Sequence, residues 1–475
     1  MIRLSSRSSS RKFYSGLIIA VIVTACLLLA REPELRLAVP LLVGCTAVMV
    51  VMLAVTLYLG EKGALSWSIT TILGVALLLR LLFVTAPPQL SDDIYRYLWD
   101  GCTLLRGGNP YASAPASVTP SPALSDIHRL INHPQCVTIY PPGAQVVFAG
   151  GAAVGGSVGL KALLVLLDMG LCALLVVLLQ QLEIPVWRAV LYAWNPLPIL
   201  EIAGSGHVDG VGLTLLMGAI LLILSERKDD PSAALRRWPF YLSGGLLAGA
   251  CLIKLFPLVL TPVFCLLVPR PRRVTFLAGF VMMSVALTLP FLPPLTNMLV
   301  SLEVYARNWE FAGFAFTTLR TLTGSGPVAR CLLAGVLVMI VGVVCFRLKK
   351  RLNHELTTTG MGLAALAASY TITLSFLMLS PTLQPWYALS LAVLLPFCAS
   401  PAGLLLCWAV FLTYQVQIAY FISGKWTENL YVTAAVFWAP LIVMVFNFGR
   451  NFIRNHSPKE GSGTEPVDIS LSDCY

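Results

Sequence analysis

The chain has 475 residues, of which 57% are hydrophobic and only 11% are charged. Soluble proteins carry about 25% charged residues, so this composition excludes an ordinary soluble domain. The formal net charge of +10 could indicate nucleic-acid binding. Most of the excess, however, lies in short loops and at the termini, where lysine and arginine orient membrane helices. We therefore expect contact with membrane lipids and none with nucleic acid.

Apolar runs long enough to cross a hydrocarbon core of about 30 Å recur along the whole sequence. They predict an all-α polytopic membrane protein with about 12 to 14 transmembrane helices. The expected spans, in chain order, are 14–30, 37–60, 64–86, 162–182, 188–204, 208–225, 239–254, 256–269, 274–292, 328–347, 359–380, 387–399, 402–421 and 430–448.

Two stretches leave alternatives open. The run 144–160 is apolar but rich in glycine, and is either a re-entrant helix or a crossing that replaces 188–204. Segment 239–269 is basic on both flanks, and Lys254 and Pro257 lie at its middle. Because proline breaks a helix, we expect a broken hairpin that carries Lys254 deep into the membrane or to its far face.

Basic loops determine the expected orientation. They are the N-terminus, 226–237, 270–273, 346–351 and 450–454, and the positive-inside rule makes them cytoplasmic. Both termini are then cytoplasmic, and the outer segments are 87–143, 293–327, 381–386 and 422–427. We expect one transmembrane domain over 1–453 and a disordered cytoplasmic tail over 454–475. Cys102 and Cys136 share the first outer loop and could pair in an oxidising compartment.

The first outer loop contains the most informative stretch, which runs from Ser91 to Gly101 and holds three acids, one arginine and three aromatic residues. As a helix, it puts Asp93, Tyr97 and Asp100 on one face. Arg96 can pair with Asp100 at i+4, which leaves another acid free as a base. The alternative is an amphipathic helix at the membrane surface, anchored by its aromatic side chains.

Further polar and aromatic residues are expected on the same outer side. They are Asn109, Tyr140, Glu201, His207, Asp209, Arg320, Trp386 and Tyr387. His207 could donate to a phosphate or a sugar hydroxyl, with Asp209 orienting it. The alternative role for Asp209 is a helix N-cap. Trp386 and Tyr387 either stack on a sugar or belong to an aromatic belt.

Lys254 is the best single candidate for a phosphate contact, because it is cationic, flexible and enclosed. The alternative is a lysine that snorkels to the interface. Asp92 and Asp93 could bind Mg²⁺ or Mn²⁺, but no cluster of ligands accompanies them, so we expect no metal and no cofactor. The sequence contains no P-loop and no GxSxG elbow, since its one GxSxG pattern, at 155–159, lies inside the glycine-rich apolar run. This argues against α/β-hydrolases and ATPases.

Four motifs together resemble those of the GT-C superfamily of membrane glycosyltransferases, in particular the bacterial polyprenol-phosphate-mannose-dependent mannosyltransferases. They are 91–101 with 108–111, Tyr140-Pro141-Pro142, 195–209, and Lys254 to Pro257. Two spans precede the helix at which such enzymes usually begin, so we expect an extended opening of the fold.

The resemblance implies an inverting transfer of a sugar, with mannose as the first choice, from a polyprenyl-phosphate donor to an envelope glycolipid or glycan. The site would face the periplasm or exterior of a bacterial inner membrane. Asp93 aligns best with the general base of such enzymes, and Asp92 is the second choice. Arg96, Lys254, His207 and Arg320 are the candidates for binding the donor phosphate.

The remaining candidates, Tyr97, Asp100, Asn109, Tyr140, Glu201, Asp209, Trp386 and Tyr387, would bind the sugar or the acceptor. The rival function is a transporter or flippase for a lipid-linked sugar. Transporters commonly contain inverted repeats and polar residues at mid-membrane, whereas the polar residues here are predicted to gather at one face.

Overall fold

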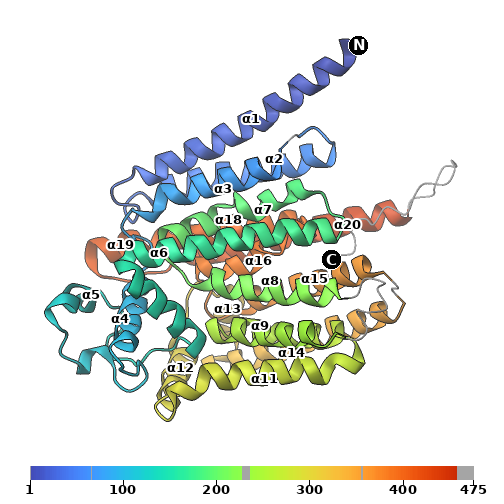
Figure 1. Cartoon of the computed structure of the whole chain (residues 1–475). Helices are drawn as coiled ribbons and strands as arrows, with labels where there is room; N and C mark the ends of the chain where they lie inside the picture. Colours follow the sequence, from blue (N-terminus) through green and yellow to red (C-terminus); the bar gives the residue numbers. More distant parts are fainter. Residues whose placement is uncertain (1, 66, 227–235, 355–356, 457–475) are drawn as a thin grey trace.

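The computed structural model describes residues 2–65, 67–226, 236–354 and 357–456 (Figure 1). Within these ranges the chain is helical, with two isolated β-bridges that join residues 311–312 to Thr382. The part of the tail beyond residue 456 lies outside the described residues. The elements up to residue 225 are α1 (Ile2–Ala30), α2 (Val39–Glu61), α3 (Ile69–Val84), α4 (Asp93–Leu105), η1 (Pro115–Ser117), η2 (Pro122–Leu124), α5 (Ser125–Arg129), α6 (Pro142–Gln181), η3 (Val186–Ala189), α7 (Val190–Ala193), η4 (Pro198–Gly204) and α8 (Asp209–Ser225).

The remaining elements complete the helical bundle and include several short helical turns. They are α9 (Trp238–Ile253), η6 (Phe256–Leu260), α10 (Thr261–Leu267), η7 (Arg270–Arg272), α11 (Arg273–Thr288), η8 (Leu289–Phe291), α12 (Thr296–Asn308), α13 (Phe314–Thr323), α14 (Gly326–His354), α15 (Thr358–Leu379), η9 (Pro385–Ala388), α16 (Leu389–Ala392), α17 (Leu395–Cys398), α18 (Pro401–Ala409), η10 (Val410–Tyr414), α19 (Gln415–Ser423) and α20 (Leu430–His456).

Seven helical segments of the described chain are long and apolar enough to cross a membrane. They lie in α1, α2, α6, α11 with its flanking turns, α14, α15 and α18–α19. Helices η4 and α8 form an eighth candidate that is bent by 120°, and four shorter apolar helices lie at 69–84, 238–253, 256–267 and 430–446. The all-α polytopic membrane fold is therefore confirmed. The expected count of 12 to 14 crossings stays a prediction, since it needs the shorter helices to cross as well.

Several predicted spans are broken rather than straight. The run 144–160 forms the first limb of α6, which is interrupted by non-helical backbone at Gly155 and Gly156. Segment 188–204 was predicted as one span, but it is divided among η3, α7 and η4, and 387–399 is likewise divided into short helices. The predicted interruption at Lys254 is confirmed, because α9 ends at Ile253 and Lys254 has extended backbone.

Glycines allow close helix contacts at two places in the bundle. A Cβ atom on Gly244 of α9 would lie 1.9 Å from the backbone oxygen of Phe276 in α11. A Cβ atom on Gly101 of α4 would lie 2.3 Å from the backbone oxygen of Phe148 in α6. Small residues of this kind let membrane helices approach through their backbones, and the second contact fixes α4 directly against α6.

A buried ion pair ties three of these elements together. Arg80 Nε in α3 lies 2.5 Å from Asp168 Oδ2 in α6, and both side chains are fully buried. Tyr192 of α7 donates a hydrogen bond of 2.5 Å to the other oxygen of Asp168. No pattern in the sequence predicted this cluster. Its complete burial marks it as part of the scaffold.

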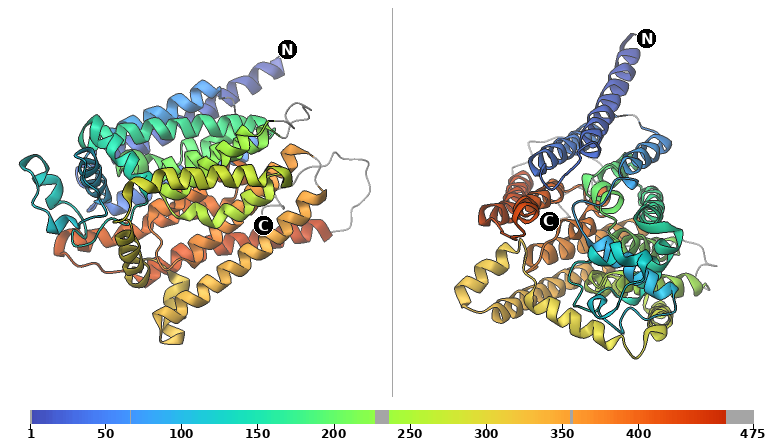
Figure 2. Two further views of the ribbon diagram at one scale, coloured as in Figure 1. Left: turned by 60° about the horizontal axis from the view of Figure 1, so that its bottom comes forward. Right: turned by 90° about the vertical axis from the view of Figure 1, so that its left-hand side faces the viewer.

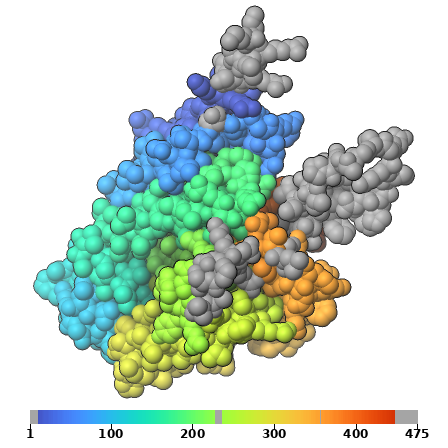
Figure 3. Space-filling view, turned by 45° about the vertical axis from the view of Figure 1, so that its right-hand side comes forward, coloured from blue at the N-terminus to red at the C-terminus, as the bar shows by residue number. Residues whose placement is uncertain are grey.

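Most helices run side by side, and the connections that bear the predicted site gather at one end (Figure 1). Helices α4, α5, α12 and α19 lie at that end, at the left of Figure 1, whereas the start of α1 points to the other end. The right-hand view of Figure 2 looks onto the end that carries α4 and α5. Figure 3 brings the right-hand side of Figure 1 forward and shows the green and yellow segments packed against each other.

Candidate active site

A cavity of about 990 Å³ opens among the segments that were predicted to be outside the membrane. Its wall includes Asp93 and Tyr140 from 87–143, Trp309 from 293–327, Thr382 from 381–386 and Trp426 from 422–427. All four predicted outer segments therefore contribute to one cavity. Segments that are far apart in sequence converge there, as expected of an active site.

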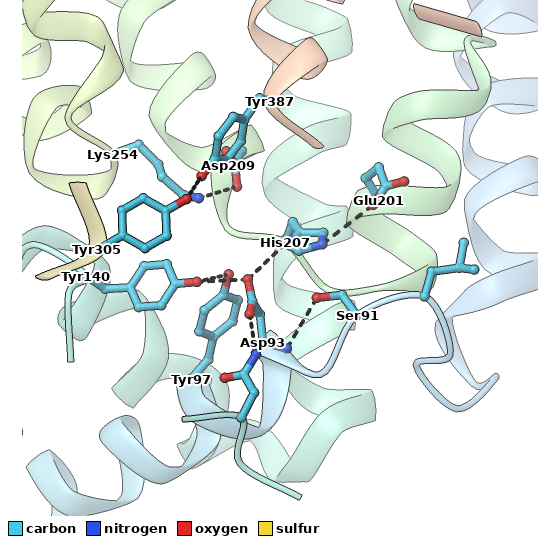
Figure 4. A network of polar contacts seen from close by, with 12 residues as sticks. Ser91, Asp93, Tyr97, Tyr140, Glu201, His207, Asp209, Lys254, Tyr305 and Tyr387 are labelled. Atoms are coloured by element: carbon cyan, nitrogen blue, oxygen red, sulfur yellow. Dashed lines mark hydrogen bonds and ion pairs between the residues drawn. The ribbon is translucent and has the colours of Figure 1, made fainter. Parts of the chain in front are cut away.

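Asp93 is the first residue of α4, and its carboxylate is held by hydrogen bonds on both oxygens (Figure 4). Tyr140 donates to Oδ2 at 2.9 Å, and Asn132 donates to Oδ1 at 3.0 Å. A helix N-terminus favours a negative charge. The Asp93 side chain is 17% exposed, and an ionised carboxylate has about four lone-pair sites. Asp93 can therefore accept a proton from a molecule in the cavity.

Tyr140 is itself held by a second tyrosine. The hydroxyl of Tyr97 donates to that of Tyr140 at 3.2 Å, and the Tyr97 ring stacks on Phe148 at a centroid distance of 4.2 Å. Burial and the nearby Asp93 carboxylate raise the pKa of Tyr140 well above its usual value, so its hydroxyl stays a donor. Tyr97 lies behind Tyr140 and is not part of the cavity wall. It was predicted to bind sugar, but in the structure it positions Tyr140.

Asp92 also lines the cavity, but it lies in a different environment. Burial raises the pKa of its carboxyl, and the neighbouring charge of Arg36 opposes that rise. Arg36 in turn pairs with Glu34, at 2.7 Å. The two adjacent acids therefore have separate partners, and of the two Asp93 is the one that accepts a hydrogen bond from Tyr140.

Lys254 supplies a cation to the cavity wall. Its Nζ lies 3.3 Å from Asp209 Oδ2, and 5.4 and 5.5 Å from the ring centroids of Tyr140 and Tyr387. The hydroxyls of Tyr387 and Tyr305 share a hydrogen bond of 2.7 Å. Because Tyr140 contacts Asp93 through its hydroxyl and Lys254 through its ring, the base candidate and the cation share one wall (Figure 4).

His207 has a different position from the one predicted, since it is fully buried and does not line the cavity. Its Nδ1 lies 3.9 Å from Asp93 Oδ2, and its Nε2 lies 3.5 Å from Glu201 Oε2. The ring stacks on Trp386 at 4.0 Å. Asp209 was expected to orient His207, but it pairs with Lys254 instead. The N-cap alternative for Asp209 is also wrong, because α8 begins at Asp209 and its N-cap is Val208.

Glu201 likewise lies outside the cavity wall and is fully buried. Tyr414, whose side chain does line the cavity, donates to Glu201 Oε1 at 2.8 Å. Glu201 was expected to bind sugar or acceptor. In the structure it faces His207 and Tyr414 instead of open space.

The predicted pair between Arg96 and Asp100 is present. Arg96 Nε lies 3.1 Å from Asp100 Oδ1, and Arg96 also donates to the backbone oxygen of Cys136 at 2.7 Å. Burial raises the pKa of Asp100, and the Arg96 charge opposes the rise. Arg96 borders the cavity, whereas Asp100 lies behind it. Cys102 and Cys136 are both free thiols, so they are not paired.

Two further candidates lie outside the cavity. Asn109 donates to the backbone oxygen of Phe291 and accepts from the backbone of Tyr111, which fixes the loop. Arg320 pairs with Glu310 and does not line the cavity. Neither residue therefore contacts the space that a substrate could fill.

Sequence reasoning missed several residues of the wall. They are Arg36, Asn132, Tyr305, Arg330 and Tyr414. Arg330, rather than Arg320, faces the cavity, and it donates to Glu310 at 3.2 Å. Asn132 lies in the first outer loop, 39 residues after Asp93, and no spacing in the sequence links the two. Trp386 and Tyr387, which were predicted, do line the cavity.

One part of the cavity wall is apolar. Gly212 and Leu213 of α8, Leu255 and Phe256 after the break at Lys254, and Phe376 and Leu377 of α15 contribute to it. A cavity with a cation next to an apolar surface fits an amphiphile with a charged head. Within the described ranges, no group of three or more His, Cys, Asp or Glu side chains is arranged to hold a metal ion.

Residues 17–270 match the model of the alpha-(1→6)-mannopyranosyltransferase family, N-terminal domain. The match includes Asp93, Tyr140, His207 and Lys254, and it covers just over half of the chain. It begins within the first predicted span, so the expected extension before the family's fold is wrong. No curated protein matches the chain. The match favours a transferase over a transporter, and the chain belongs to this mannopyranosyltransferase family as a GT-C-type mannosyltransferase of the membrane.

Proposed function

We propose that the protein transfers mannose from a polyprenyl-phosphate donor to a glycolipid or glycan acceptor, with inversion at the anomeric carbon. The observation that carries this proposal is the Asp93 carboxylate, which opens into the cavity beside Lys254 while Tyr140 and Asn132 hold its oxygens. The pairing of a fixed carboxylate with a cation suits a hydroxyl nucleophile and a phosphate leaving group.

Asp93 acts as the general base. Its carboxylate takes the proton of the acceptor hydroxyl while that oxygen forms a bond to the anomeric carbon. The bond between the anomeric carbon and the phosphate oxygen breaks, and its electron pair goes to the phosphate. A single displacement of this kind inverts the configuration. Asp92 is the second choice for the base, since it lines the same cavity on the side of Arg36.

Lys254 meets the charge that develops on the departing phosphate. The aromatic rings of Tyr140 and Tyr387 bracket its ammonium group, and Asp209 steadies it at 3.3 Å. The apolar wall that follows Lys254 would receive the first part of the polyprenyl chain. Arg96 adds positive charge to the wall, although Asp100 and a backbone oxygen already occupy its guanidinium. His207 and Arg320 are not retained as phosphate ligands, because neither lines the cavity.

The reaction would take place at the outer face of a bacterial cell membrane. This orientation is supported by the predicted outer segments, which converge on the cavity, and by the start of α1, which lies toward the opposite end of the bundle. A monophosphate at a cationic site can leave without a metal, so we expect transfer without added Mg²⁺ or Mn²⁺.

The test is single-turnover transfer from radiolabelled polyprenyl-phosphate-mannose to a membrane lipid extract by the purified protein. We expect Asp93→Asn to lose about 10²-fold or more in rate, the usual scale for a lost general base. Asp126→Asn is the matched control, because Asp126 is exposed, pairs with Arg129 and lies outside the cavity. Loss of activity in Asp92→Asn alone would move the base to Asp92.

A further inference from the structure

The imidazole of His207 lies between two carboxylates and outside the cavity wall (Figure 4). Nδ1 lies 3.9 Å from Asp93 Oδ2, and Nε2 lies 3.5 Å from Glu201 Oε2. Within the described part of the chain, the carboxylates of Asp93 in α4 and Glu201 in η4 lie within 4 Å of the ring nitrogens, and the charge of Lys254 acts on the ring from after α9. The ring therefore directs one nitrogen toward the proposed base and the other toward a second acid.

The backbone and a stacked ring hold His207 in this orientation. Its backbone N–H donates to the backbone oxygen of Glu201 at 2.9 Å, which closes the turn between η4 and α8. Gly206, just before it, has a φ of +81°, a conformation that side chains rarely adopt. Trp386 stacks on the ring at 4.0 Å with an interplanar angle of 21°. The ring is therefore fixed in place.

Among the residues that the structure describes, neither ring nitrogen of His207 has a hydrogen-bond partner, and neither does Glu201 Oε2. Buried polar atoms without hydrogen-bond partners destabilise the folded state, so three such atoms on two adjacent side chains suggest a functional role. Catalytic hydrogen bonds are often long in the empty enzyme and shorten when substrate binds. The contacts from Asp93 to His207 and from His207 to Glu201 are long in this way. Of these three residues, only Asp93 lines the cavity.

We propose that His207 is a positioning residue that shares with Asp93 the proton taken from the acceptor, and that Glu201 completes the relay. In the resting state the proton of His207 is on Nε2, directed at the Glu201 carboxylate. As Asp93 receives the acceptor proton, a proton passes from Asp93 to Nδ1. The proton on Nε2 passes to Glu201, so the imidazole is neutral before and after the transfer.

The relay makes Asp93 a more effective base. The acceptor proton does not stay on Asp93 but passes through His207 to Glu201, so Asp93 is a carboxylate again as the acceptor oxygen attacks. Tyr414 donates to the other oxygen of Glu201 and so holds the carboxylate that receives the proton. After the product leaves, the proton returns to the cavity by the same path, from Glu201 through His207 to Asp93. This inference rests on the proposed function of Asp93.

A proton inventory tests the relay directly. Single-turnover rates are measured in mixtures of H₂O and D₂O, with polyprenyl-phosphate-mannose as donor and a membrane lipid extract as acceptor. Wild type should give a curved plot, because more than one proton moves in the rate-determining step. His207→Gln should be slower by about a hundredfold, with an unchanged acceptor KM and a straight plot. A straight plot for wild type would overturn the relay without any variant.

Companion variants separate the relay from folding and from the base itself. Tyr414→Phe should slow transfer, whereas Tyr370→Phe should not, although Tyr370 is also buried and donates to Ser400 at 2.7 Å. Added imidazole should restore part of the rate to His207→Ala. A curved plot or a wild-type rate in His207→Gln would refute the relay and leave Asp93 as the base. Full activity in Asp93→Asn would instead refute the proposed base.

Discussion

Lys254→Met removes the cation that we assign to the donor phosphate. A hydrogen bond to a charged group contributes about 1.5–3 kcal/mol. Because the Lys254 side chain is 23% exposed, solvent screens part of this interaction energy, and we expect the variant to lose about 2 kcal/mol of it. At about 1.4 kcal/mol per factor of ten, kcat/KM for the lipid donor should fall by about 30-fold. Arg188→Gln is a matched control, because it removes a cation whose partner, Glu61, lies far from the cavity.

The variant Lys254→Met also leaves Asp209 without its partner, which could by itself explain a loss of activity. The double variant Lys254→Met/Asp209→Asn removes this second effect. If Lys254 binds the phosphate, the double variant stays impaired by a similar factor in steady-state transfer assays over a range of donor concentrations. Recovery of the wild-type kcat/KM would mean that Lys254 only neutralises Asp209, and would refute the phosphate assignment.

Three further predictions concern stability, measured as the midpoint of thermal unfolding in detergent. Gly101→Ala should destabilise the folded protein by about 1–3 kcal/mol, since its Cβ would meet a backbone oxygen of α6 at 2.3 Å. Gly170→Ala is the control and should not destabilise it, because the space around Gly170 is open. Equal unfolding midpoints for the two variants would contradict the close contact. Arg80→Leu should cost about 3–5 kcal/mol, because it leaves the buried Asp168 carboxylate without its cation and with only the hydrogen bond from Tyr192. An unchanged midpoint would argue against the ion pair. Burial raises the pKa of Asp92, so the charge of its carboxylate disfavours the folded state as the pH rises through that pKa. Asp92→Asn removes this charge, and the increase in the unfolding midpoint should be larger at pH 7 than at pH 4. An equal gain at both values would exclude that shift.

Local patterns were predictable where the geometry of one helix decides the contact. Arg96 and Asp100 lie four residues apart, so a helix over this segment brings them together, and the structure has this pair. Pro257 cannot continue a helix with normal hydrogen bonding, so the interruption beside Lys254 was also foreseeable. The hydropathy of the chain was sufficient to predict a helical membrane protein.

The contacts between distant segments were not predictable. His207 was expected to face a substrate, because the sequence puts it beside Asp209, but the turn after η4 directs it toward Glu201 and Asp93 instead. Arg320 and Arg330 are equally basic in sequence, and only the packing of α13 against α14 determines which one reaches the cavity. Such choices depend on tertiary structure, which no periodicity encodes.

The most direct test of the account is to supply purified wild-type protein in liposomes with labelled polyprenyl-phosphate-mannose and a membrane glycolipid extract, and to analyse the product. The account predicts a mannosylated product whose anomeric configuration is opposite to that of the donor, formed by wild type and lost in Asp93→Asn. Movement of the labelled lipid across the bilayer without any mannosylated product, or a product that retains the donor configuration, would contradict it.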